Sequence, residues 1–407
     1  MTGPSPSPEP SLHVPGFRFT GVSCGLKPKT AAYRDAALDL ALIASDEPCS
    51  AAGVFTRNRF PAAPVLLDRE LLGANPGAIR AVAINAGNAN ACTGAQGLAD
   101  ARRTAALTEA ALALPAGSAL VMSTGVIGLP MAMDKVESGV AAAAGALSAG
   151  PEAVWQAAQA IMTTDTRPKM ATARAGRARL LGIAKGAGMI HPDMATLLAC
   201  VVTDAAVEPG ALQAMLGRAA GRSFNAISVD GDTSTNDTLL ALANGLAGAT
   251  DPAAFEAALT EVCIDLAQQI VRDGEGASKF VGIHVSGAGS LGAARQVAQT
   301  IATSLLVKTA IYGGDPNWGR VLAAAGRSGV ELDPQKVALW FADASGPALQ
   351  VVAGGTPLAY DEAEAARIFT QDHLNIYLDL GMGQATATVW TTDLGHGYVD
   401  INAHYRT

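Results

Sequence analysis

Aromatic residues are scarce in this sequence, and long apolar segments are missing. Aromatic side chains make up 5% of the chain, although 49% of its residues are hydrophobic. Since no run of about 18 apolar residues occurs, we expect no membrane-spanning helix. The core must instead be built mainly from Ala, Val, Leu and Ile, and the 44 glycines allow close approaches between backbone segments. This composition is typical of a compact enzyme.

Charge of one sign is not concentrated anywhere in the chain. The formal net charge is -8, and lysine and arginine occur singly rather than in clusters. A clustered basic surface is the electrostatic footprint of proteins that bind nucleic acid or anionic membranes. We therefore expect neither a nucleic-acid partner nor a membrane partner.

Cysteine pairs and a targeting segment are also lacking. The five cysteines are odd in number and show no CxxC spacing, which argues against a disulfide framework and a thiolate zinc site. The first ten residues, MTGPSPSPEP, contain no Lys or Arg and resemble neither a secretory leader nor a transit peptide. We expect residues 1–12 to form a disordered tail and the protein to be cytoplasmic.

The chain is long enough for more than one domain or layer, because 407 residues exceed the size at which a single core stops growing. Residues 40–65 are expected to form a strand, a polar turn and a second strand, and residues 81–94 a strand that runs into a Gly/Asn-rich loop. An Ala/Leu helix is expected from Asp100. The apolar run SALVMSTGVIG predicts a buried strand that ends in a small polar loop at Ser123, Thr124 and Gly125.

The clearest helix signal lies in the second half of the chain. Asp251 and Pro252 form an N-cap and first-turn pair, and apolar residues then recur at spacings of three and four. The helix is expected to stop at DGEG, residues 273–276, before a strand over residues 280–286. Glu275 is therefore expected on a helix-to-strand turn.

The pattern changes again after this strand. We expect a helix over residues 291–305, strands in VALWFAD and ALQVV, and a hairpin in NIYLDLGMGQATATVWTTDL. These elements predict a C-terminal subdomain of about residues 286–407. The sequence contains no repeat of fixed period and no heptad seam.

The densest small-residue signal is KGAGMIHPDMATLLACVVTDA, residues 185–205. A Gly-rich turn and a Pro are followed by Ala195, Thr196 and an apolar strand. A threonine at the start of a buried strand is ordinarily only a good β former, and a Gly-rich loop alone is unspecific. These residues by themselves indicate no particular chemistry.

The segment nevertheless resembles the self-cleavage motif of the ornithine acetyltransferase family, the glutamate N-acetyltransferases of arginine biosynthesis. The match extends along nearly the whole chain in eight ordered motifs: INAGNANACTG at Ile84, STGVIG at Ser123, TTDTRPK at Thr163, KGAGMI at Lys185, SVDGDTSTND at Ser228, DGEGASK at Asp273, GGDPNWGR at Gly313 and INAHYRT at Ile401. The resemblance implies an α/β fold, a layered α-β-β-α sandwich of the ornithine acetyltransferase/aminopeptidase type with a C-terminal α/β subdomain.

The resemblance also implies that the chain cuts itself between Ala195 and Thr196. The Thr196 hydroxyl would attack the Ala195 carbonyl, which is uncrowded because the side chain of Ala195 is small. Hydrolysis of the resulting ester would leave an alpha chain, residues 13–195, and a beta chain, residues 196–407. The new amino group, with a reference pKa of about 7.7 to 8, can accept the hydroxyl proton. Nucleophile and base are then one residue, and no Ser/His/Asp triad is needed.

The same resemblance assigns the remaining site residues. Thr124, through its hydroxyl, and Gly125, through its backbone N–H, would stabilise the oxyanion. Without the resemblance, this pair could simply turn a strand. The implied substrate contacts are Thr163, Lys185, Thr196, Glu275, Asn402 and Thr407.

The substrate contacts suit an amino acid. Lys185 can offer a cation to a carboxylate, and Glu275 can hold an ammonium group. Without the resemblance both would be read as solvated surface charges, and Asn402 and Thr407 as a frayed tail.

The implied reaction transfers an acetyl group from N2-acetyl-L-ornithine to L-glutamate by a ping-pong route through acetyl-Thr196. No cofactor is needed, although some family members also accept acetyl-CoA, and the sequence leaves this donor open. Two alternatives remain: a related self-processing amidohydrolase or aminopeptidase that uses water as the acceptor, and an uncleaved binding protein. The family also suggests that alpha and beta chains assemble as a heterotetramer.

Three other features are assigned to structure. GGDPNWGR is expected to be a tight loop whose Trp318 buries a corner. His191 is either an ordinary loop residue or close enough to the cleavage point to change the amine pKa. No metal is expected at the carboxylate run of Asp230, Asp232 and Asp237, because this run lacks the calcium-loop pattern.

Overall fold

The computed structural model describes residues 12–27, 37–191, 197–344 and 348–404. The predicted cleavage pair Ala195 and Thr196, the predicted contact Thr407 and nearly all of the predicted tail lie outside these ranges. Within them, none of the helices combines the length and the apolar character that crossing a membrane requires. The five cysteines are all unpaired, as expected from their spacing.

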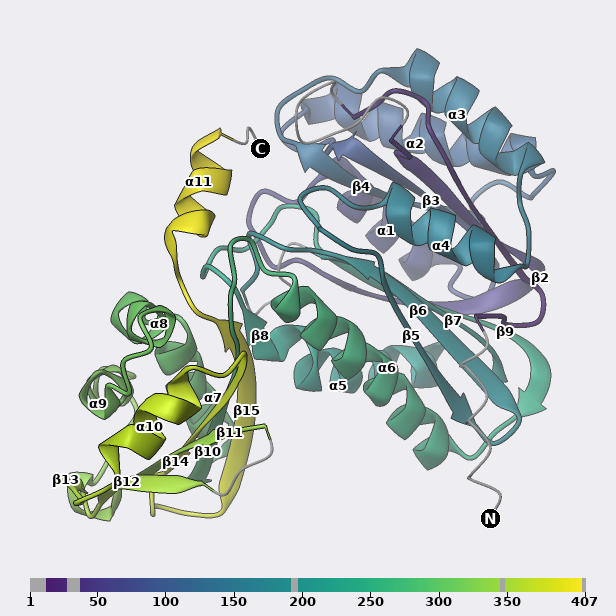
Figure 1. The fold of residues 1–407 in the computed structure, drawn as a ribbon. Helices are drawn as coiled ribbons and strands as arrows, with labels where there is room; N and C mark the ends of the chain where they lie inside the picture. Colours follow the sequence, from purple (N-terminus) through teal and green to yellow (C-terminus); the bar gives the residue numbers. More distant parts are fainter. Residues whose placement is uncertain (1–11, 28–36, 192–196, 345–347, 405–407) are drawn as a thin grey trace, which may run out of the picture.

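A first sheet of eight strands organises the first unit of the chain (Figure 1). Its order is β4-β3-β2-β9-β7-β6-β5, and β1 is added against β2. The strands are β1 (Phe17–Val22), β2 (Leu40–Phe55), β3 (Ile79–Asn88), β4 (Ala119–Val126), β5 (Lys169–Ala175), β6 (Ala178–Lys185), β7 (Leu198–Ala206) and β9 (Thr238–Ala249).

Strand β2 joins two layers of this sheet. Its residues 40–45 pair with β1 and its residues 50–55 pair with β9. The expected strand, turn and strand over residues 40–65 is therefore wrong, because the exposed residues 46–48 mark a shift of register within one continuous strand. The predicted second strand instead ends at Phe55, and a helix with Pro in its first turn follows.

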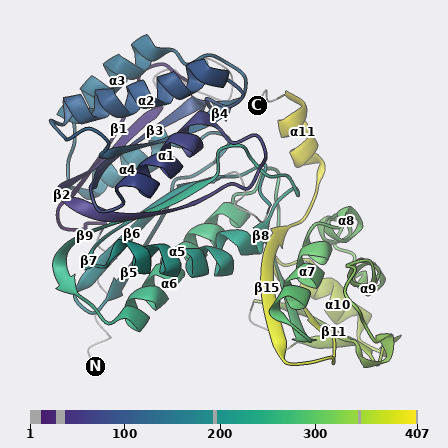
Figure 2. The same cartoon turned by 180° about the vertical axis from the view of Figure 1, so that it is seen from behind.

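The layers form the predicted α-β-β-α sandwich, seen from behind in Figure 2. Ile43 and Ile84 pack against Leu181 and Val202 in a central core between the two strand layers. Their neighbours along β2 and β3 face outward onto α1, α2 and α3, as the period of two in a strand requires. On the other side, α5 and α6 cover β6, β7 and β9. The helices are α1 (Ala63–Ala74), α2 (Gly94–Ala111), α3 (Met133–Gly145), α4 (Pro151–Ala160), α5 (Pro209–Arg222) and α6 (Pro252–Arg272).

The second unit is a seven-stranded sheet of order β13-β12-β11-β14-β10-β15-β8, with helices packed on one face. Helix α11 follows β15 and extends back toward the first unit (Figure 1). The elements are β8 (Ile227–Ser228), β10 (Phe280–Ala288), β11 (Ala338–Asp343), β12 (Leu349–Ala353), β13 (Thr356–Pro357), β14 (His373–Asp379), β15 (Ala385–Thr392), α7 (Leu291–Ala302), α8 (Leu305–Tyr312), α9 (Trp318–Gly326), α10 (Glu362–Phe369) and α11 (His396–His404).

Two expectations for the second unit are wrong. The predicted hairpin does not form, because β10 lies between the two strands and pairs parallel with β14 and antiparallel with β15. Val281 and Ile283 of β10 are fully buried on the face of the sheet that the helices cover. The predicted helix over residues 291–305 is two helices, since α7 ends at Ala302 and α8 begins at Leu305.

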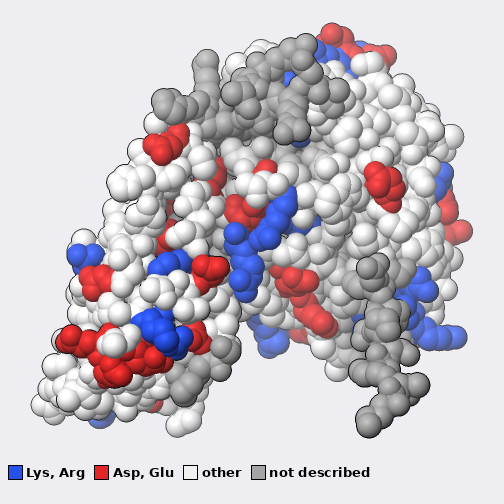
Figure 3. Space-filling view, viewed as in Figure 1, with Lys and Arg blue, Asp and Glu red and all other residues white. Residues whose placement is uncertain are grey.

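Other expectations are confirmed. The Asp251 side chain accepts a hydrogen bond of 2.8 Å from the Ala254 N–H and caps α6, which ends directly before the DGEG turn. Trp318 packs, partly buried, against the core of the second unit, although it begins α9, so that the predicted tight loop ends at Asn317. Helix α2, however, begins at Gly94 rather than at Asp100. On the face shown in Figure 3, acidic and basic side chains are interspersed, as their scatter in the sequence suggests.

Candidate active site

A cavity of about 150 Å³ lies where the ends of β4 and β6, the DGEG turn and α11 meet. The six predicted site residues that the structure describes all line it. They come from distant segments of the sequence and are Thr124, Gly125, Thr163, Lys185, Glu275 and Asn402.

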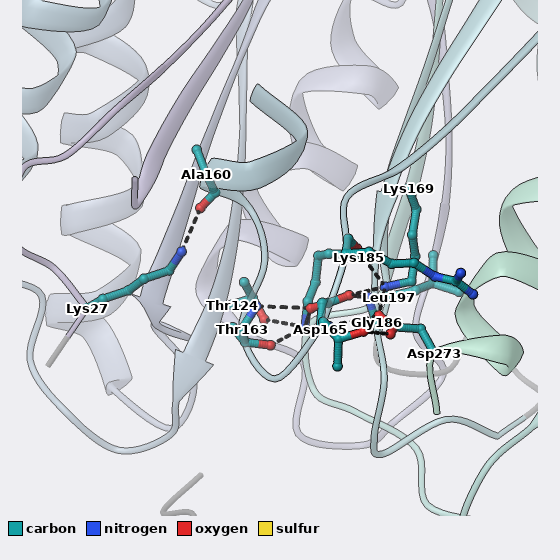
Figure 4. Close-up of polar contacts among 12 residues, drawn as sticks. Lys27, Thr124, Ala160, Thr163, Asp165, Lys169, Lys185, Gly186, Leu197 and Asp273 are labelled. Carbon is teal, nitrogen blue, oxygen red and sulfur yellow. Dashed lines mark hydrogen bonds and ion pairs between the residues drawn. The ribbon is translucent and has the colours of Figure 1, made fainter. Parts of the chain in front are cut away.

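Lys185 is the central cation of this cavity (Figure 4). Its Nζ donates hydrogen bonds to Thr163 Oγ1 at 2.7 Å and to Thr124 Oγ1 at 3.4 Å, and lies 3.9 Å from Asp165 Oδ2. The side chain stands at the end of β6 and is only 3% exposed, so its interpretation as a solvated surface charge is wrong. Burial lowers the pKa of Lys185, and the nearby Asp165 carboxylate opposes that shift.

A buried ion-pair network lies next to Lys185. Asp165 accepts hydrogen bonds from the Thr163 N–H at 3.0 Å, the Gly186 N–H at 2.6 Å and Lys169 Nζ at 2.6 Å. Lys169 also bonds Asp273 at 2.6 Å, at the end of α6. Burial raises the pKa of Asp165, but the two lysines outweigh it and hold the pKa below its usual range. The network thus joins three segments around the cavity.

Thr124 and Gly125 lie within β4 rather than in a loop after it, because β4 stays paired with β3 up to Val126. Gly125 has a φ of +129°, and a Cβ at this position would come 2.3 Å from the carbonyl carbon of Gly87. Only glycine fits both conditions. Because the Lys185 ammonium can only donate, Thr124 Oγ accepts from it and the Thr124 hydroxyl proton stays available for another acceptor.

Glu275 is held between the loop after β6 and helix α11. Its N–H donates to the Ala187 carbonyl at 3.0 Å, and its Oε2 accepts from Asn402 Nδ2 at 2.8 Å. A Cβ on Gly188 would come 2.3 Å from Glu275 Oε2, so the carboxylate lies directly against this glycine. Glu275 is 9% exposed, which excludes a fully solvated side chain.

The sequence did not predict two further residues that line the cavity, Asp230 and Tyr398. The Asp230 carboxylate accepts from the N–H groups of Met189 and Ile190 at 2.6 and 3.0 Å, and from the Tyr398 hydroxyl at 3.2 Å. Burial raises the pKa of Asp230. Its place two residues after β8 and directly before Gly231 is a weak signal of a carboxylate that binds backbone N–H groups.

Asp237, the last member of the carboxylate run, is also engaged with the backbone. Its Oδ1 accepts from the Leu197 N–H at 3.0 Å, while its buried Oδ2 has no hydrogen-bond partner among the residues that the structure describes. In the described part of the chain, no group of three His, Cys, Asp or Glu side chains converges as a metal site requires. Near the same segment, His191 Nδ1 lies 3.3 Å from Ser228 Oγ.

Known proteins resemble this chain over almost its full length. The sequence pattern of the ArgJ family matches residues 18–407. The arginine biosynthesis bifunctional protein ArgJ of Symbiobacterium thermophilum is 49% identical over 403 residues, covering 96% of this chain and 97% of the relative. That of Thermotoga neapolitana is 47% identical over 409 residues, covering 97% and 100%.

Two solved structures are also similar. An ArgJ structure from Bacillus halodurans is 40% identical, with a TM-score of 0.46, and covers 50% of this chain and 96% of that chain. An ornithine acetyltransferase from Mycobacterium tuberculosis, complexed with ornithine, is 38% identical with a TM-score of 0.39 and covers 46% and 96%. From the family match and the identity to its curated relatives, the chain belongs to the ArgJ family.

Proposed function

We propose that the chain is a glutamate N-acetyltransferase of arginine biosynthesis that moves an acetyl group from N2-acetyl-L-ornithine to L-glutamate through acetyl-Thr196. The curated relatives are named arginine biosynthesis bifunctional proteins. The observation that carries the proposal is the buried Lys185 beside Thr124, Gly125 and Glu275 in one cavity.

Self-cleavage comes first in this proposal. The Thr196 Oγ–C bond to Ala195 forms, the C–N bond breaks, and the hydroxyl proton passes to the freed amine; water then hydrolyses the ester. Leu198, two residues after Thr196, pairs directly with Lys185 across β6 and β7. This register supports the assignment, because it ties the strand that begins just after the cut to the cavity.

Acetyl transfer follows the same chemistry. Thr196 Oγ attacks the acetyl carbonyl and its amine takes the proton; the C–N bond breaks and ornithine leaves with that proton. The glutamate amine then attacks acetyl-Thr196 and gives up a proton to the Thr196 amine; the ester C–O bond breaks, and Thr196 Oγ leaves and recovers that proton. The free hydroxyl proton of Thr124 and the N–H of Gly125 would donate to the oxyanion, for which one donor contributes roughly 100- to 1000-fold in rate. Lys185 would bind a substrate carboxylate, and Glu275 would bind a substrate amine. Asn402 and Thr407 would supply further polar contacts to the substrate.

The two pieces would stay together after the cut. Strand β2 of the first piece pairs with β9 of the second, and β6 pairs with β7. Backbone hydrogen bonds in the middle of the first sheet would therefore hold an alpha chain to residue 195 against a beta chain from residue 196. We further propose a cytoplasmic enzyme that needs no cofactor and pairs as a heterotetramer, with acetyl-CoA open as a second donor.

Denaturing mass analysis of the purified protein tests the proposal. The wild type should give two fragments that meet at Ala195 and Thr196, whereas Thr196→Ala should stay one chain and lose glutamate acetylation from N2-acetyl-L-ornithine. Thr172→Ala, on β5, is the matched control and should cut and react normally. An uncut wild-type chain with full activity would contradict the mechanism. Release of acetate in the absence of glutamate would favour the hydrolase instead.

A further inference from the structure

The C-terminal helix α11 is packed closely against the DGEG turn. A Cβ on Gly276, which has a φ of +66°, would come 2.2 Å from the Tyr398 nitrogen and 2.4 Å from the Gly397 carbonyl carbon. Glycine at 276 is therefore what allows the first turn of α11 to lie on this surface. From there α11 reaches the loop before the proposed cleavage point along two separate routes.

The first route runs through Glu275. Asn402 on α11 donates to Glu275 Oε2 at 2.8 Å, and the same carboxylate lies against Gly188. This route belongs to the proposed substrate site. The second route runs through Asp230 and Tyr398, which have no assigned role in the proposed chemistry.

In the second route, Asp230 holds two consecutive peptide groups of the loop. Its Oδ2 accepts from the Met189 N–H at 2.6 Å and its Oδ1 from the Ile190 N–H at 3.0 Å. Met189 has a φ of +55°, which is uncommon for a residue with a side chain and needs support from its surroundings. The two hydrogen bonds that Asp230 accepts from this loop supply that support.

Tyr398 holds Asp230 in place from the opposite side. Its hydroxyl donates to Asp230 Oδ2 at 3.2 Å, the same oxygen that accepts from Met189. The Asp232 N–H adds a bond of 3.2 Å to Oδ1. Asp230 is thus the point at which the loop of residues 186–191, the loop after β8 and the last helix of the chain are joined.

We propose that Asp230 and Tyr398 are positioning residues for self-cleavage. Asp230 sets the backbone of Met189 and Ile190, and Tyr398 fixes Asp230 once α11 has docked. The chain therefore cuts itself efficiently only after its C-terminal helix is in place, so that the cut follows completion of the fold. This inference rests on the self-cleavage proposed above.

The test is a time course of cleavage in freshly translated protein, with the cut fraction measured by denaturing mass analysis. Tyr398→Phe, which removes one hydroxyl, should cut about tenfold more slowly than wild type. Asp230→Asn should be slower still, because an amide nitrogen replaces one of the two accepting oxygens and cannot accept from a peptide N–H. Tyr377→Phe, on the far sheet, is the matched control and should cut at the wild-type rate.

Two further measurements separate positioning from general destabilisation. The double variant should cut no more slowly than Asp230→Asn alone, since Tyr398 acts through Asp230. In a Thr196→Ala background, which cannot cut, Tyr398→Phe should leave the unfolding temperature nearly unchanged. Cleavage of Tyr398→Phe at the wild-type rate overturns this inference and leaves the proposed function standing. A wild-type chain that never cuts overturns both.

Discussion

At the scale of single residues, the cavity is supported by buried charges that compensate one another. Lys169 is fully buried and bonds two carboxylates, Asp165 and Asp273, each at 2.6 Å. Removing the shared cation would leave two buried carboxylates near each other, with Lys185 remaining 3.9 Å from Asp165. Because Asp165 also accepts from the Gly186 N–H, such a change would reach the loop after β6 as well.

We therefore expect Lys169→Met to lower the free energy of unfolding by about 3–5 kcal/mol, the usual cost of breaking a buried ion pair. Urea unfolding of the wild type and of Lys169→Met measures this loss of stability. The control is Lys336→Met, whose exposed pair with Asp333 spans 3.6 Å and should contribute less than about 1 kcal/mol. Equal losses in the two variants would show that the network is not a buried one.

The sequence predicted the residues that line the cavity better than it predicted the residues with which they form hydrogen bonds and ion pairs. Lys185 and Glu275 were identified through motif resemblance, and the structure brings them to one cavity. Lys169 and Asp165 stand in the motif TTDTRPK, but nothing in its spacing indicates that both side chains are buried. Such pairings depend on segments that meet only in three dimensions, as Tyr398 and Asp230 do.

At the scale of elements, strands and helices were predictable where periodicity is strong, as in α6, but strand partners were not. The residues of β14 and β15 predict two strands near each other in sequence, and hairpin pairing is the local default. β10 nevertheless inserts between them and pairs with both, although it is apolar on one face only, with His284 on the other face. A sequence pattern shows which face of a strand is buried but not which strands are its neighbours.

Close packing between elements gives a prediction for the loop after β6. In Gly188→Ala the new methyl group would come 2.3 Å from Glu275 Oε2, so the carboxylate must move away from Asn402. We expect the rate of acetyl transfer, measured in an assay of glutamate acetylation, to fall at least tenfold. This fold-change corresponds to about 1.4 kcal/mol of lost interaction.

Gly217→Ala is the matched control for this change. Gly217 lies within α5, and a Cβ there meets nothing within 4 Å. An alanine in this position should stabilise the protein by roughly 0.4–1 kcal/mol and leave activity unchanged. Full activity of Gly188→Ala would show that Glu275 can shift without consequence.

At the scale of the whole molecule, the two units are linked by short segments of chain that cross between them. Strand β8, although it follows α5 and the short 3-10 helix Phe224–Ala226 of the first unit, adds to the edge of the second sheet next to β15. Helix α11 runs in the other direction, from β15 back to the cavity (Figure 2). These exchanges were not visible in the sequence, since a two-residue strand and a terminal helix carry almost no periodic signal.

The response of the whole fold to pH should depend on Asp68. This residue lies on α1 and is fully buried against β4; its Oδ1 accepts from the Val121 N–H at 2.9 Å, but its Oδ2 has no hydrogen-bond partner within the described ranges. Burial raises the pKa of Asp68 well above its usual value. The folded state therefore binds this proton more tightly than the unfolded state does.

The sign of the effect follows from that difference. The stability that the protonated Asp68 contributes is fully present below the unfolded pKa of about 3.9 and is lost as pH rises through the higher folded pKa. Asp68→Asn, which keeps the shape and cannot ionise, should resemble the wild type in acid and become increasingly more stable than it as pH rises. Urea unfolding of both proteins at a series of pH values measures the difference, and Asp372→Asn, an exposed site, controls for the loss of one negative charge. A wild type and Asp68→Asn whose stabilities stay parallel across that series would mean that Asp68 is ionised within the fold and has found a partner for Oδ2.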